Sequence, residues 1–425
     1  MKTKLFLILI IATMALTACG KSTPTAVQTK APVENLAEAP TTAATEAPAE
    51  VQTETPAETY PVEVPGQVTD SPASTYPIEQ TAVPAVTYPI EQPVGPYTVV
   101  DALGREVAFD KVPERIALVG KGVFMVADAV YTYPETSSRV IAIAAMNQKS
   151  EAFIKMIDTD FASKQSIDKT AGPEQIAALQ PDCVILKTTN PDLAAGLETL
   201  KIPYLYVDFE TPEQYTRDLT TLGQLFQNPQ RAAELSGFFA DNLKTIEAGL
   251  VGLKEEEKPT TLLLYYDEAD GAIAFKVAPV SWMQTTIVNL AGGIPAWTDT
   301  PLDKGWTIVS LEQVAAWNPD VIVVTSYNGS IPEIVEKLKT DPQWQLLDAV
   351  KNGKLFGMAA DVYSFDQPDT RWALGVEWLA AILHPERFPD YDLTTSAQRF
   401  YQQLYMMDEA SFQQNIVPLL TGTEN

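Results

Sequence analysis

The sequence predicts an α/β protein of two Rossmann-like lobes, joined by one long helix and with a ligand cleft between them. Apolar runs alternate with helical stretches in both halves of the chain, a helix–turn–strand unit occurs twice, and one strongly periodic helix separates the two copies. Roughly 325 residues follow a low-complexity region, which is more than one hydrophobic core normally serves. Two domains are therefore expected.

The repeated unit is a short helix, a Pro-Asp turn and a wholly apolar strand. Residues 174–186 reappear at residues 312–324 with the same Glu-Gln start and the same Pro-Asp turn. Proline ends the helix, and a strand that is apolar at every position is buried on both faces, as in a parallel sheet covered by helices. Two such units predict two similar lobes.

Each lobe is expected to alternate strands with helices. The first lobe, residues 97–227, has predicted strands at 115–119, 140–144, 183–186 and 204–207. The second lobe, residues 257–425, has predicted strands at 261–266, 321–325 and 354–358, and a helix near 282–291 that Gly292 and Gly293 end.

A long helix is predicted between the lobes, within residues 228–256. Asn228 can cap it, Pro229 fits its first turn, and apolar residues recur at three- and four-residue spacing to about Leu253. Its length would be about 37 Å. A rigid helical link of this kind would permit only small movements of the lobes.

The first twenty residues have the order of an export signal. Lys2 and Lys4 precede an apolar run at residues 5–16, which is too short to span a membrane comfortably. The sequence Leu-Thr-Ala-Cys at 16–19 resembles the lipobox of bacterial lipoproteins. The resemblance implies removal of a signal peptide, residues 1–18, and lipidation of Cys19, which would anchor the protein at the cell surface or in the periplasm. An ordinary secretory signal is the alternative.

Residues 19–96 are expected to be a disordered stalk. Pro, Thr, Ala, Glu and Val dominate, and no Lys or Arg occurs between Lys30 and Arg105. Such a composition cannot build a core. A flexible chain of this length spans on the order of 50 Å, so a folded head could move freely above a bilayer.

Composition excludes several functional classes. The net charge is −26 and no cluster of Lys and Arg is visible, so nucleic acid is not an expected partner. Once Cys19 is lipidated, only Cys183 remains, and its apolar surroundings make it a core residue. Sites for bare Zn²⁺ or Mn²⁺ need several imidazoles, whereas this chain has only His384, which is expected to be structural.

Several motifs together resemble a known family. They are Asp-Ala-Leu-Gly-Arg-Glu-Val at 101–107, Pro-Glu-Arg-Ile at 113–116, the two repeated units, Leu-Ala-Gly-Gly at 290–293, Trp-Leu-Ala at 378–380 and His-Pro-Glu-Arg-Phe at 384–388. In this order they look like the iron-siderophore and cobalamin binding proteins of ABC importers, the type with a single interlobe helix. The resemblance implies capture of a ferric siderophore, corrinoid or haem, and delivery to a permease and its ATPase. It also implies a permease-docking carboxylate on each lobe, for which Asp192 and Glu333 are the candidates.

Ligands of open α/β sheets bind beyond the carboxyl ends of the strands, and this rule selects candidate residues. They are Lys121, Phe124, Asn147 and Lys187 in the first lobe, and Trp282, Trp306, Tyr327, Tyr363, Phe365, Arg371 and Trp372 in the second. Aromatic faces beside a fixed guanidinium suit a bulky anionic chelate. No resident cofactor or metal is expected, and the protein is expected to be a monomer.

Three alternatives stay open. The ligand could be an oxyanion such as molybdate or tungstate, held by hydroxyl and backbone N–H donors. An enzyme is disfavoured, because no nucleophile motif, phosphate-binding loop or set of cluster-binding cysteines is present. A surface adhesin is suggested only by the stalk.

Overall fold

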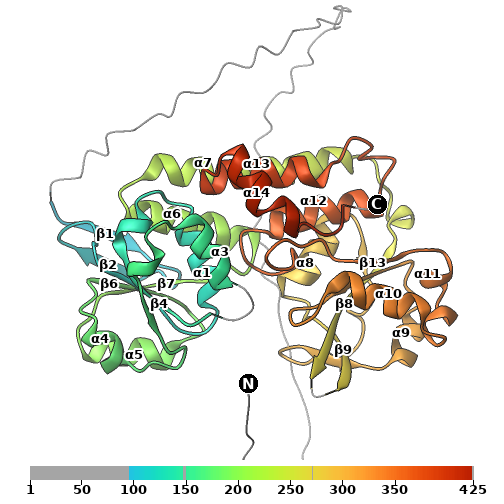
Figure 1. Ribbon diagram of the computed structural model, residues 1–425, viewed down its shortest axis with the longest axis horizontal. Helices are drawn as coiled ribbons and strands as arrows, with labels where there is room; N and C mark the ends of the chain where they lie inside the picture. Colours follow the sequence, from blue (N-terminus) through green and yellow to red (C-terminus); the bar gives the residue numbers. More distant parts are fainter. Residues whose placement is uncertain (1–94, 147–149, 270, 424–425) are drawn as a thin grey trace, which may run out of the picture. The chain divides into compact units, whose positions relative to one another are not determined.

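The computed structural model describes residues 95–146, 150–269 and 271–423 (Figure 1). The predicted signal peptide, Cys19 and all of the predicted stalk except its last two residues lie outside this part. None of the helices within it combines the length and the apolar composition needed to cross a membrane.

The first lobe is built on a five-stranded parallel sheet in the order β5-β4-β3-β6-β7. The strands are β3 (Ile116–Leu118), β4 (Val140–Ala144), β5 (Gln165–Ile167), β6 (Cys183–Lys187) and β7 (Tyr204–Val207). Every residue of β3, β6 and β7 is buried, so the expectation of a sheet covered on both faces is confirmed. The sequence did not predict β5, because two of its three residues are exposed and no apolar run marks it.

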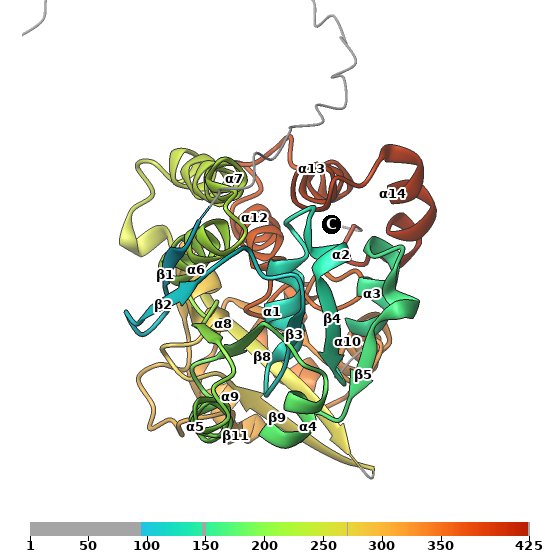
Figure 2. The ribbon, with the colours of Figure 1, turned by 90° about the vertical axis from the view of Figure 1, so that its left-hand side faces the viewer.

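Helices cover both faces of this sheet (Figures 1 and 2). They are α1 (Val123–Val130), α2 (Thr136–Arg139), α3 (Ser150–Ile157), α4 (Pro173–Ala178), α5 (Pro191–Thr199) and α6 (Pro212–Leu225), with a 3₁₀ turn η1 (Phe161–Ser163). Alternate residues of β6 face opposite ways: Ile185 joins the core beneath α1 and α6, whereas Val184 joins a second core with α4 and α5.

The second lobe has a mixed sheet in the order β11-β9-β8-β12-β13, with β10 paired to β8. Its strands are β8 (Thr260–Ala269), β9 (Ala272–Val277), β10 (Ile294–Pro295), β11 (Thr307–Val309), β12 (Val321–Thr325) and β13 (Leu355–Gly357). The strands β8, β10, β12 and β13 are parallel, whereas β9 pairs antiparallel with β8, and β11 pairs antiparallel with β9. These two antiparallel strands were not predicted, because β9 is exposed or half-buried over five of its six residues.

The helices that follow in the chain complete the second lobe. They are α8 (Met283–Leu290), α9 (Leu311–Trp317), α10 (Ile331–Thr340), α11 (Asp348–Lys351), α12 (Trp372–Leu383), α13 (Leu393–Tyr405) and α14 (Glu409–Asn415), with 3₁₀ turns η2 (Glu255–Glu257), η3 (Trp344–Leu346) and η4 (Val417–Leu419). The predicted helix near 282–291 is α8, and Gly292 turns the chain after it with φ +80°.

The two copies of the repeated unit have the same surroundings. The carboxylate of Asp182 accepts hydrogen bonds from the backbone N–H groups of Glu114 and Arg115 at 2.9 and 2.8 Å, just before β3. The carboxylate of Asp320 accepts one from the N–H of Thr260 at 2.8 Å, at the start of β8. Each aspartate therefore ties its strand to the neighbouring parallel strand, and the predicted internal duplication is confirmed.

The glutamine of each copy caps a helix. The side-chain oxygen of Gln175 accepts from the N–H of Gly172 at 2.9 Å, and that of Gln313 accepts from the N–H of Ser310 at the same distance. Both bonds satisfy an amide at a helix start that has no partner within the helix. The Glu-Gln element of the repeat is thus a capping signal rather than part of a binding site.

A hairpin of β1 (Tyr97–Val100) and β2 (Glu106–Phe109) precedes the first sheet. Its turn depends on Asp101, whose carboxylate accepts from the N–H groups of Leu103 and Arg105 and pairs with the Arg105 guanidinium at 2.7 Å. Gly104 adopts φ +74°, where other residues are strained. This geometry explains the Asp-Ala-Leu-Gly-Arg motif as a structural turn.

The long helix α7 (Pro229–Gly249) runs from the end of the first lobe to the start of the second. The side-chain oxygen of Asn228 accepts from the N–H of Arg231 at 3.1 Å, which confirms the predicted cap. The helix ends four residues before the expected Leu253, and Gly252 then turns the chain with φ +77°. It packs against α6, α12 and α13 (Figures 1 and 2).

Two helical glycines, one tightly packed and one open, provide a matched test of the packing of α12 against the backbone of Phe365. A Cβ at Gly375, in α12, would lie 2.2 Å from the backbone oxygen of Phe365, whereas a Cβ at Gly237, in α7, would meet no atom within 4 Å. Gly375→Ala should lower the free energy of unfolding by about 2–3 kcal/mol, because the backbone must shift. Gly237→Ala should raise it by about 0.5–1 kcal/mol through helix propensity. Urea denaturation measures both, and a stabilising Gly375→Ala would contradict the packing described.

Candidate ligand-binding site

The loops at the carboxyl ends of the first sheet surround a cavity of about 620 Å³. They follow β3, β4, β5 and β6 and contribute glycine, lysine, threonine and asparagine residues. The lining includes Gly120, Lys121, Gly122, Phe124, Lys169, Thr170, Gly172, Thr189, Asn190 and Asp192. Two of the predicted binding residues, Lys121 and Phe124, therefore lie where the strand-end rule places them.

The loop after β3 is shaped by two glycines and one asparagine. Gly120 and Gly122 adopt φ +87° and +74°, and a Cβ on Gly120 would lie 2.7 Å from the Asn190 side chain. The oxygen of that side chain accepts from the N–H of Lys121 at 2.8 Å. Asn190 thus fixes the loop, and Lys121 is left exposed at the rim while Phe124 is buried at the base.

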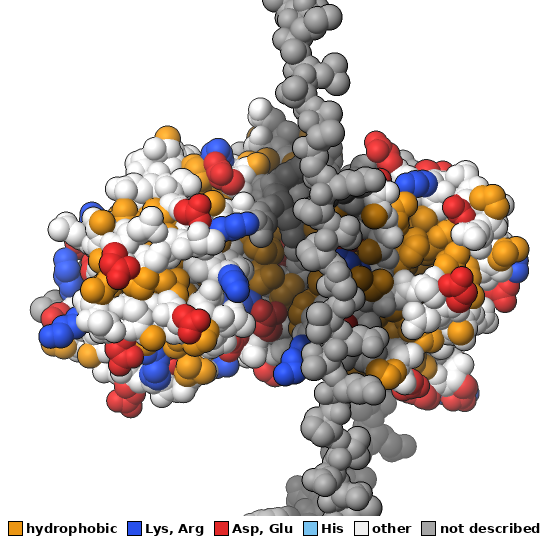
Figure 3. Space-filling model, turned by 90° about the horizontal axis from the view of Figure 1, so that it is seen from below, with side chains coloured by type: hydrophobic (Ala, Val, Ile, Leu, Met, Phe, Trp, Pro, Cys, Tyr) orange, Lys and Arg blue, Asp and Glu red, His pale blue; other side chains and the backbone are white. Residues whose placement is uncertain are grey.

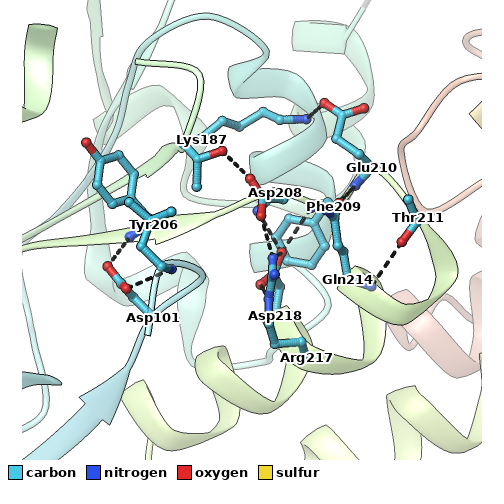
Figure 4. A network of polar contacts seen from close by, with 12 residues as sticks. Asp101, Lys187, Tyr206, Asp208, Phe209, Glu210, Thr211, Gln214, Arg217 and Asp218 are labelled. Carbon is cyan, nitrogen blue, oxygen red and sulfur yellow. Dashed lines mark hydrogen bonds and ion pairs between the residues drawn. The ribbon is translucent and has the colours of Figure 1, made fainter. Parts of the chain in front are cut away.

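Lys187 does not reach this cavity as a free cation. Its ammonium pairs with the Glu210 carboxylate, and its side chain is 3% exposed (Figure 4). A Cβ on Gly122 would meet the Lys187 chain at 2.8 Å, so the lysine supports the glycine loop from below. The predicted contact between Lys187 and a ligand is replaced by this internal ion pair, because the side chain at the end of β6 turns inward.

The segment that supplies Glu210 is itself held by a polar network (Figure 4). Asp208 pairs with the Arg217 guanidinium at 2.6 Å, and Asp218 accepts from the backbone N–H groups of Asp208 and Phe209 at 2.6 and 2.9 Å. Phe209 has φ 53°, a strained value that these bonds maintain. These bonds fix the turn that positions Glu210, the partner of Lys187.

The second lobe carries a connected group of four aromatic rings. The Trp306 ring lies 5.0, 5.5 and 6.1 Å from the rings of Tyr265, Trp282 and Tyr327. Trp282, Trp306 and Tyr327 are partly exposed, whereas Tyr265 is buried beneath them. The structure thus brings together three predicted residues that lie far apart in sequence. We call these four residues the aromatic platform.

A buried carboxylate anchors the platform from beneath. The Tyr327 hydroxyl donates to Asp366 Oδ2 at 2.6 Å, and the Thr325 hydroxyl donates to Asp366 Oδ1 at 2.8 Å. Tyr265 is held nearby, and burial followed by the charge of Asp267 raises its pKa to about 12, so its hydroxyl is neutral. The sequence analysis missed both Tyr265 and Asp366. The position of Tyr265 near the end of a predicted strand could have indicated it, but no pattern marks Asp366.

A second cavity, of about 470 Å³, lies beside the platform at the carboxyl ends of β12 and β13. Tyr327 and Tyr363 line it with serine, asparagine and glycine residues. Tyr363 is largely buried, and its hydroxyl donates to Asp128 in α1 at 2.5 Å. This tyrosine therefore lines the cavity, but its hydroxyl is bound to a first-lobe residue and its ring is packed beneath the Arg371 guanidinium.

Three predicted residues of the same loop are buried in the core. Phe365, Arg371 and Trp372 are each 0% exposed. Arg371 pairs with Asp128 at 2.8 Å and with Asp361 at 2.7 Å, and the Trp372 ring stacks on Phe239 of α7. The expected grip of a ligand by these three side chains is corrected, because Phe365 is buried in the core, the guanidinium joins the lobes and the Trp372 ring packs on α7.

The remaining candidates lie on the surface or outside the described part. Asp192 and Glu333 are exposed in the first turns of α5 and α10, the helices that follow the repeated strands β6 and β12. They lie in corresponding helices of the two lobes, Asp192 as the second residue of α5 and Glu333 as the third residue of α10. Asn147 falls among residues 147–149, which the structure does not describe.

The surface of the two lobes differs in character on the face seen in Figure 3. On the part of the first lobe, Lys and Arg side chains alternate with Asp and Glu, whereas hydrophobic side chains form a more continuous area on the part of the second lobe. Exposed Val280 and Ile308 are among the apolar residues that flank Trp282 and Trp306 in sequence.

The histidine and the described cysteine have structural environments. His384 is 2% exposed and its Nε2 lies 3.1 Å from the oxygen of Gly292. Cys183 is 0% exposed, and burial raises the pKa of its thiol well above the usual value. Within the described residues, no group of three His, Cys, Asp or Glu side chains is arranged to hold a metal ion.

Comparison with known proteins identifies the family. The sequence profile described as periplasmic binding protein matches residues 111–362, more than half of the chain. This chain belongs to the periplasmic binding protein family. Members of this family are the substrate-binding proteins of ABC transporters and not enzymes.

Curated relatives differ in what their names state. The molybdate-binding protein MolA of Haemophilus influenzae is 38% identical over 104 residues, which cover 24% of this chain and 28% of MolA. An uncharacterized ABC transporter substrate-binding lipoprotein of Bacillus subtilis is 22% identical over 70% of this chain and 88% of its own length. The vitamin B12-binding protein of Yersinia pestis is 26% identical over 46% of this chain and 65% of its own.

Solved structures share the two-lobed fold. A periplasmic solute-binding protein from Veillonella parvula has a TM-score of 0.61 and 22% identity, and covers 76% of this chain and 98% of its own. Molybdate-bound MolA has a TM-score of 0.59 and 21% identity, and covers 73% and 98%. The predicted fold class and the family resemblance are therefore confirmed.

Two tryptophans of the second lobe differ in burial, so their replacement by alanine should differ in its effect on stability. Trp297 is 0% exposed and its indole N–H donates to the oxygen of Ala278 at 2.8 Å, whereas Trp306 is partly exposed. Trp297→Ala should lower the free energy of unfolding by about 3–5 kcal/mol, and Trp306→Ala by only about 1 kcal/mol, since less area is lost. Urea denaturation checks both, and equal losses would place Trp306 in the core.

Proposed function

We propose that this protein is the substrate-binding component of an ABC importer and that it captures a bulky metal chelate: a ferric siderophore, a corrinoid or haem. The aromatic platform carries the proposal. Three partly exposed rings above a buried tyrosine and carboxylate form a surface that suits a large apolar ligand, and aromatic faces contribute large contact areas. The name of the vitamin B12-binding relative is consistent with this ligand class.

An oxyanion such as molybdate is the second candidate. The locally similar relative MolA is named for molybdate, and the glycine loop of the first lobe offers backbone N–H groups beside Lys121 and Thr189. A small anion would use this cavity and would leave the aromatic platform uncovered. A surface adhesin remains the least supported alternative, because adhesion does not require the cavities described above.

Anchoring by lipid is part of the proposal. The lipobox-like sequence at Cys19 supports it, and so does the name of the Bacillus subtilis relative, which is a lipoprotein. In this scheme the protein acts as a monomer, tethered through the predicted stalk at the cell surface or in the periplasm. The stalk would let the head reach a permease in the same membrane.

Ligand screening of the purified full chain tests the ligand class. A ferric siderophore, cyanocobalamin or haemin should raise the melting temperature, because only a ligand that prefers the folded state does so. The same compound should change tryptophan fluorescence, and Trp306→Ala should weaken its binding at least tenfold, or about 1.4 kcal/mol. Titration followed by fluorescence and calorimetry measures both effects.

Trp317→Ala is the matched control, since Trp317 lies in α9, packs against the core and belongs to no part of the platform. Its effect on affinity should be less than twofold. If molybdate alone raises the melting temperature, sulfate competes with it and no chelate binds, the chelate proposal is wrong and the oxyanion candidate replaces it.

We also propose that Asp192 and Glu333 contact the permease. Each is an exposed carboxylate in the first turn of the equivalent helix of its lobe, where negative charge is favoured by the helix dipole. Their location in corresponding helices of a duplicated fold suits a transporter with two similar halves. Such carboxylates would pair with basic residues of the partner and would set the rate and orientation of docking.

Charge reversal tests this docking. The double variant Asp192→Lys with Glu333→Lys should reduce ligand-dependent stimulation of the transporter ATPase at least tenfold, because attraction becomes repulsion. The assay uses saturating ligand, so a change in ligand affinity does not affect it. Glu336→Lys is the control, because Glu336 is exposed on the same helix α10 and pairs only with Lys339 there. If the double variant stimulates the ATPase as strongly as the natural protein, the docking proposal is wrong.

A further inference from the structure

A buried group of charges joins the two lobes. It consists of Asp128 in α1 of the first lobe, together with Asp361, Asp369 and Arg371 from the second lobe, and we call it the interlobe carboxylate cluster. All four residues have side chains that are 0% exposed to solvent. The rings of Phe153 and Tyr363 each lie 4.2 Å from the centre of the Arg371 guanidinium. The cluster is therefore sealed by residues of both lobes.

The guanidinium is shared among the carboxylates. Its Nη1 lies 2.8 Å from Asp128 Oδ2 and 4.0 Å from Asp369 Oδ1, and its Nε lies 2.7 Å from Asp361 Oδ1. Tyr363 donates to Asp128 Oδ2, and Tyr401 donates to Asp361 Oδ2. Both oxygens of Asp361 therefore have partners.

The other two carboxylates do not. Asp128 Oδ1 and Asp369 Oδ2 are buried and have no hydrogen-bond partner among the described residues. One guanidinium cannot balance three ionised carboxylates, so full ionisation would leave two uncompensated negative charges away from water. A buried carboxylate in this situation is favoured in its neutral, protonated form.

The titration behaviour agrees with the geometry. Burial raises the pKa of Asp128 from 3.8 to about 6, against the lowering influence of Arg371 and the Tyr363 hydroxyl. Burial also raises the pKa of Asp369 well above its usual value. The neighbouring hydroxyls of Tyr215, Tyr363, Tyr401 and Tyr405 all have pKa values raised first by burial, so these groups stay neutral.

We propose that Asp128 of the interlobe carboxylate cluster carries a proton in mild acid, beside a protonated Asp369, and that this proton on Asp128 stabilises the contact between the two lobes. Loss of the proton at neutral pH leaves a buried charge that weakens the contact between α1 and residues 361–371. The protein thus contains a pH-sensitive link between its lobes. This inference concerns the lobe contact alone and does not depend on the identity of the ligand.

The direction of the effect follows from proton linkage. A group whose pKa is higher in the folded state than in the unfolded state binds extra protons on folding. For Asp128, the stabilisation is complete below about pH 3.8 and is lost as the pH rises through about 6. Stability from this cluster is therefore greater in mild acid than at neutral pH.

Melting of the full chain and of Asp128→Asn at pH 4.5 and 7.5 tests the proposal. Asparagine resembles the protonated carboxyl in shape and is neutral at both values. Between these pH values, the melting temperature of the natural protein should fall by about 2–4 °C more than that of Asp128→Asn. The melting temperature of Asp369→Asn should also depend less on pH than that of the natural protein, though by a smaller amount. This variant replaces Asp128→Asn in the test if Asp128→Asn does not fold.

Hydrogen exchange locates the effect. After correction for the intrinsic rate, backbone amides of α1 and residues 361–371 should exchange severalfold faster at pH 7.5 than at pH 4.5 in the natural protein, but not in Asp128→Asn. Glu377→Gln is the matched control: burial also raises the pKa of Glu377, which contacts Asn242 and Arg399 away from the cluster. It should leave the exchange of α1 unchanged. The same pH response in the natural protein and in both Asn variants would overturn the proposal.

Discussion

The requirement that parallel strands be buried on both faces determines most of this structure. A parallel pair needs a crossover connection, and each crossover returns the chain to the same end of the sheet. The carboxyl ends of β3, β4 and β6 consequently lie together at one end of the first sheet, and those of β12 and β13 lie together at one end of the second. The two cavities described above lie at these ends of the sheets. The Pro-Asp carboxylates reinforce the arrangement by tying each repeated strand to its neighbour.

Burial decides which polar side chains remain available for a ligand. Lys121 is exposed at the rim of the first cavity, whereas Lys187, at the end of an adjacent strand, pairs internally with Glu210. In the second lobe, Trp306 and Tyr327 present part of their rings to solvent, whereas Arg371 is enclosed by carboxylates. Side chains at similar loop positions thus differ in availability, because some are open to solvent and others are paired inside the protein.

The sequence predicted the parallel part of the fold well and the antiparallel part poorly. Strands β4, β7 and β12 begin and end where the apolar runs do, because two-sided burial requires an apolar residue at every position. Strands β5, β9 and β11 were missed, since they lie at or near sheet edges and are partly exposed. Of the candidate site, the strand-end rule selected Trp282, Trp306 and Tyr327, but the packing of Tyr265 against Trp306 and Tyr327 and the support of Tyr327 by Asp366 carry no local signal.

The sequence by itself determined the two-lobed class, the duplication, the long connecting helix with its Asn228 cap and the family. These features depend on local periodicity, on capping and on contacts between residues close in the chain. Only the tertiary structure decided that Arg371 joins the lobes and that four distant aromatic residues form one platform. Such roles depend on which partners lie opposite a side chain, as Asp128 lies opposite an arginine 243 residues away. Local pattern contains no information about a pairing at that separation.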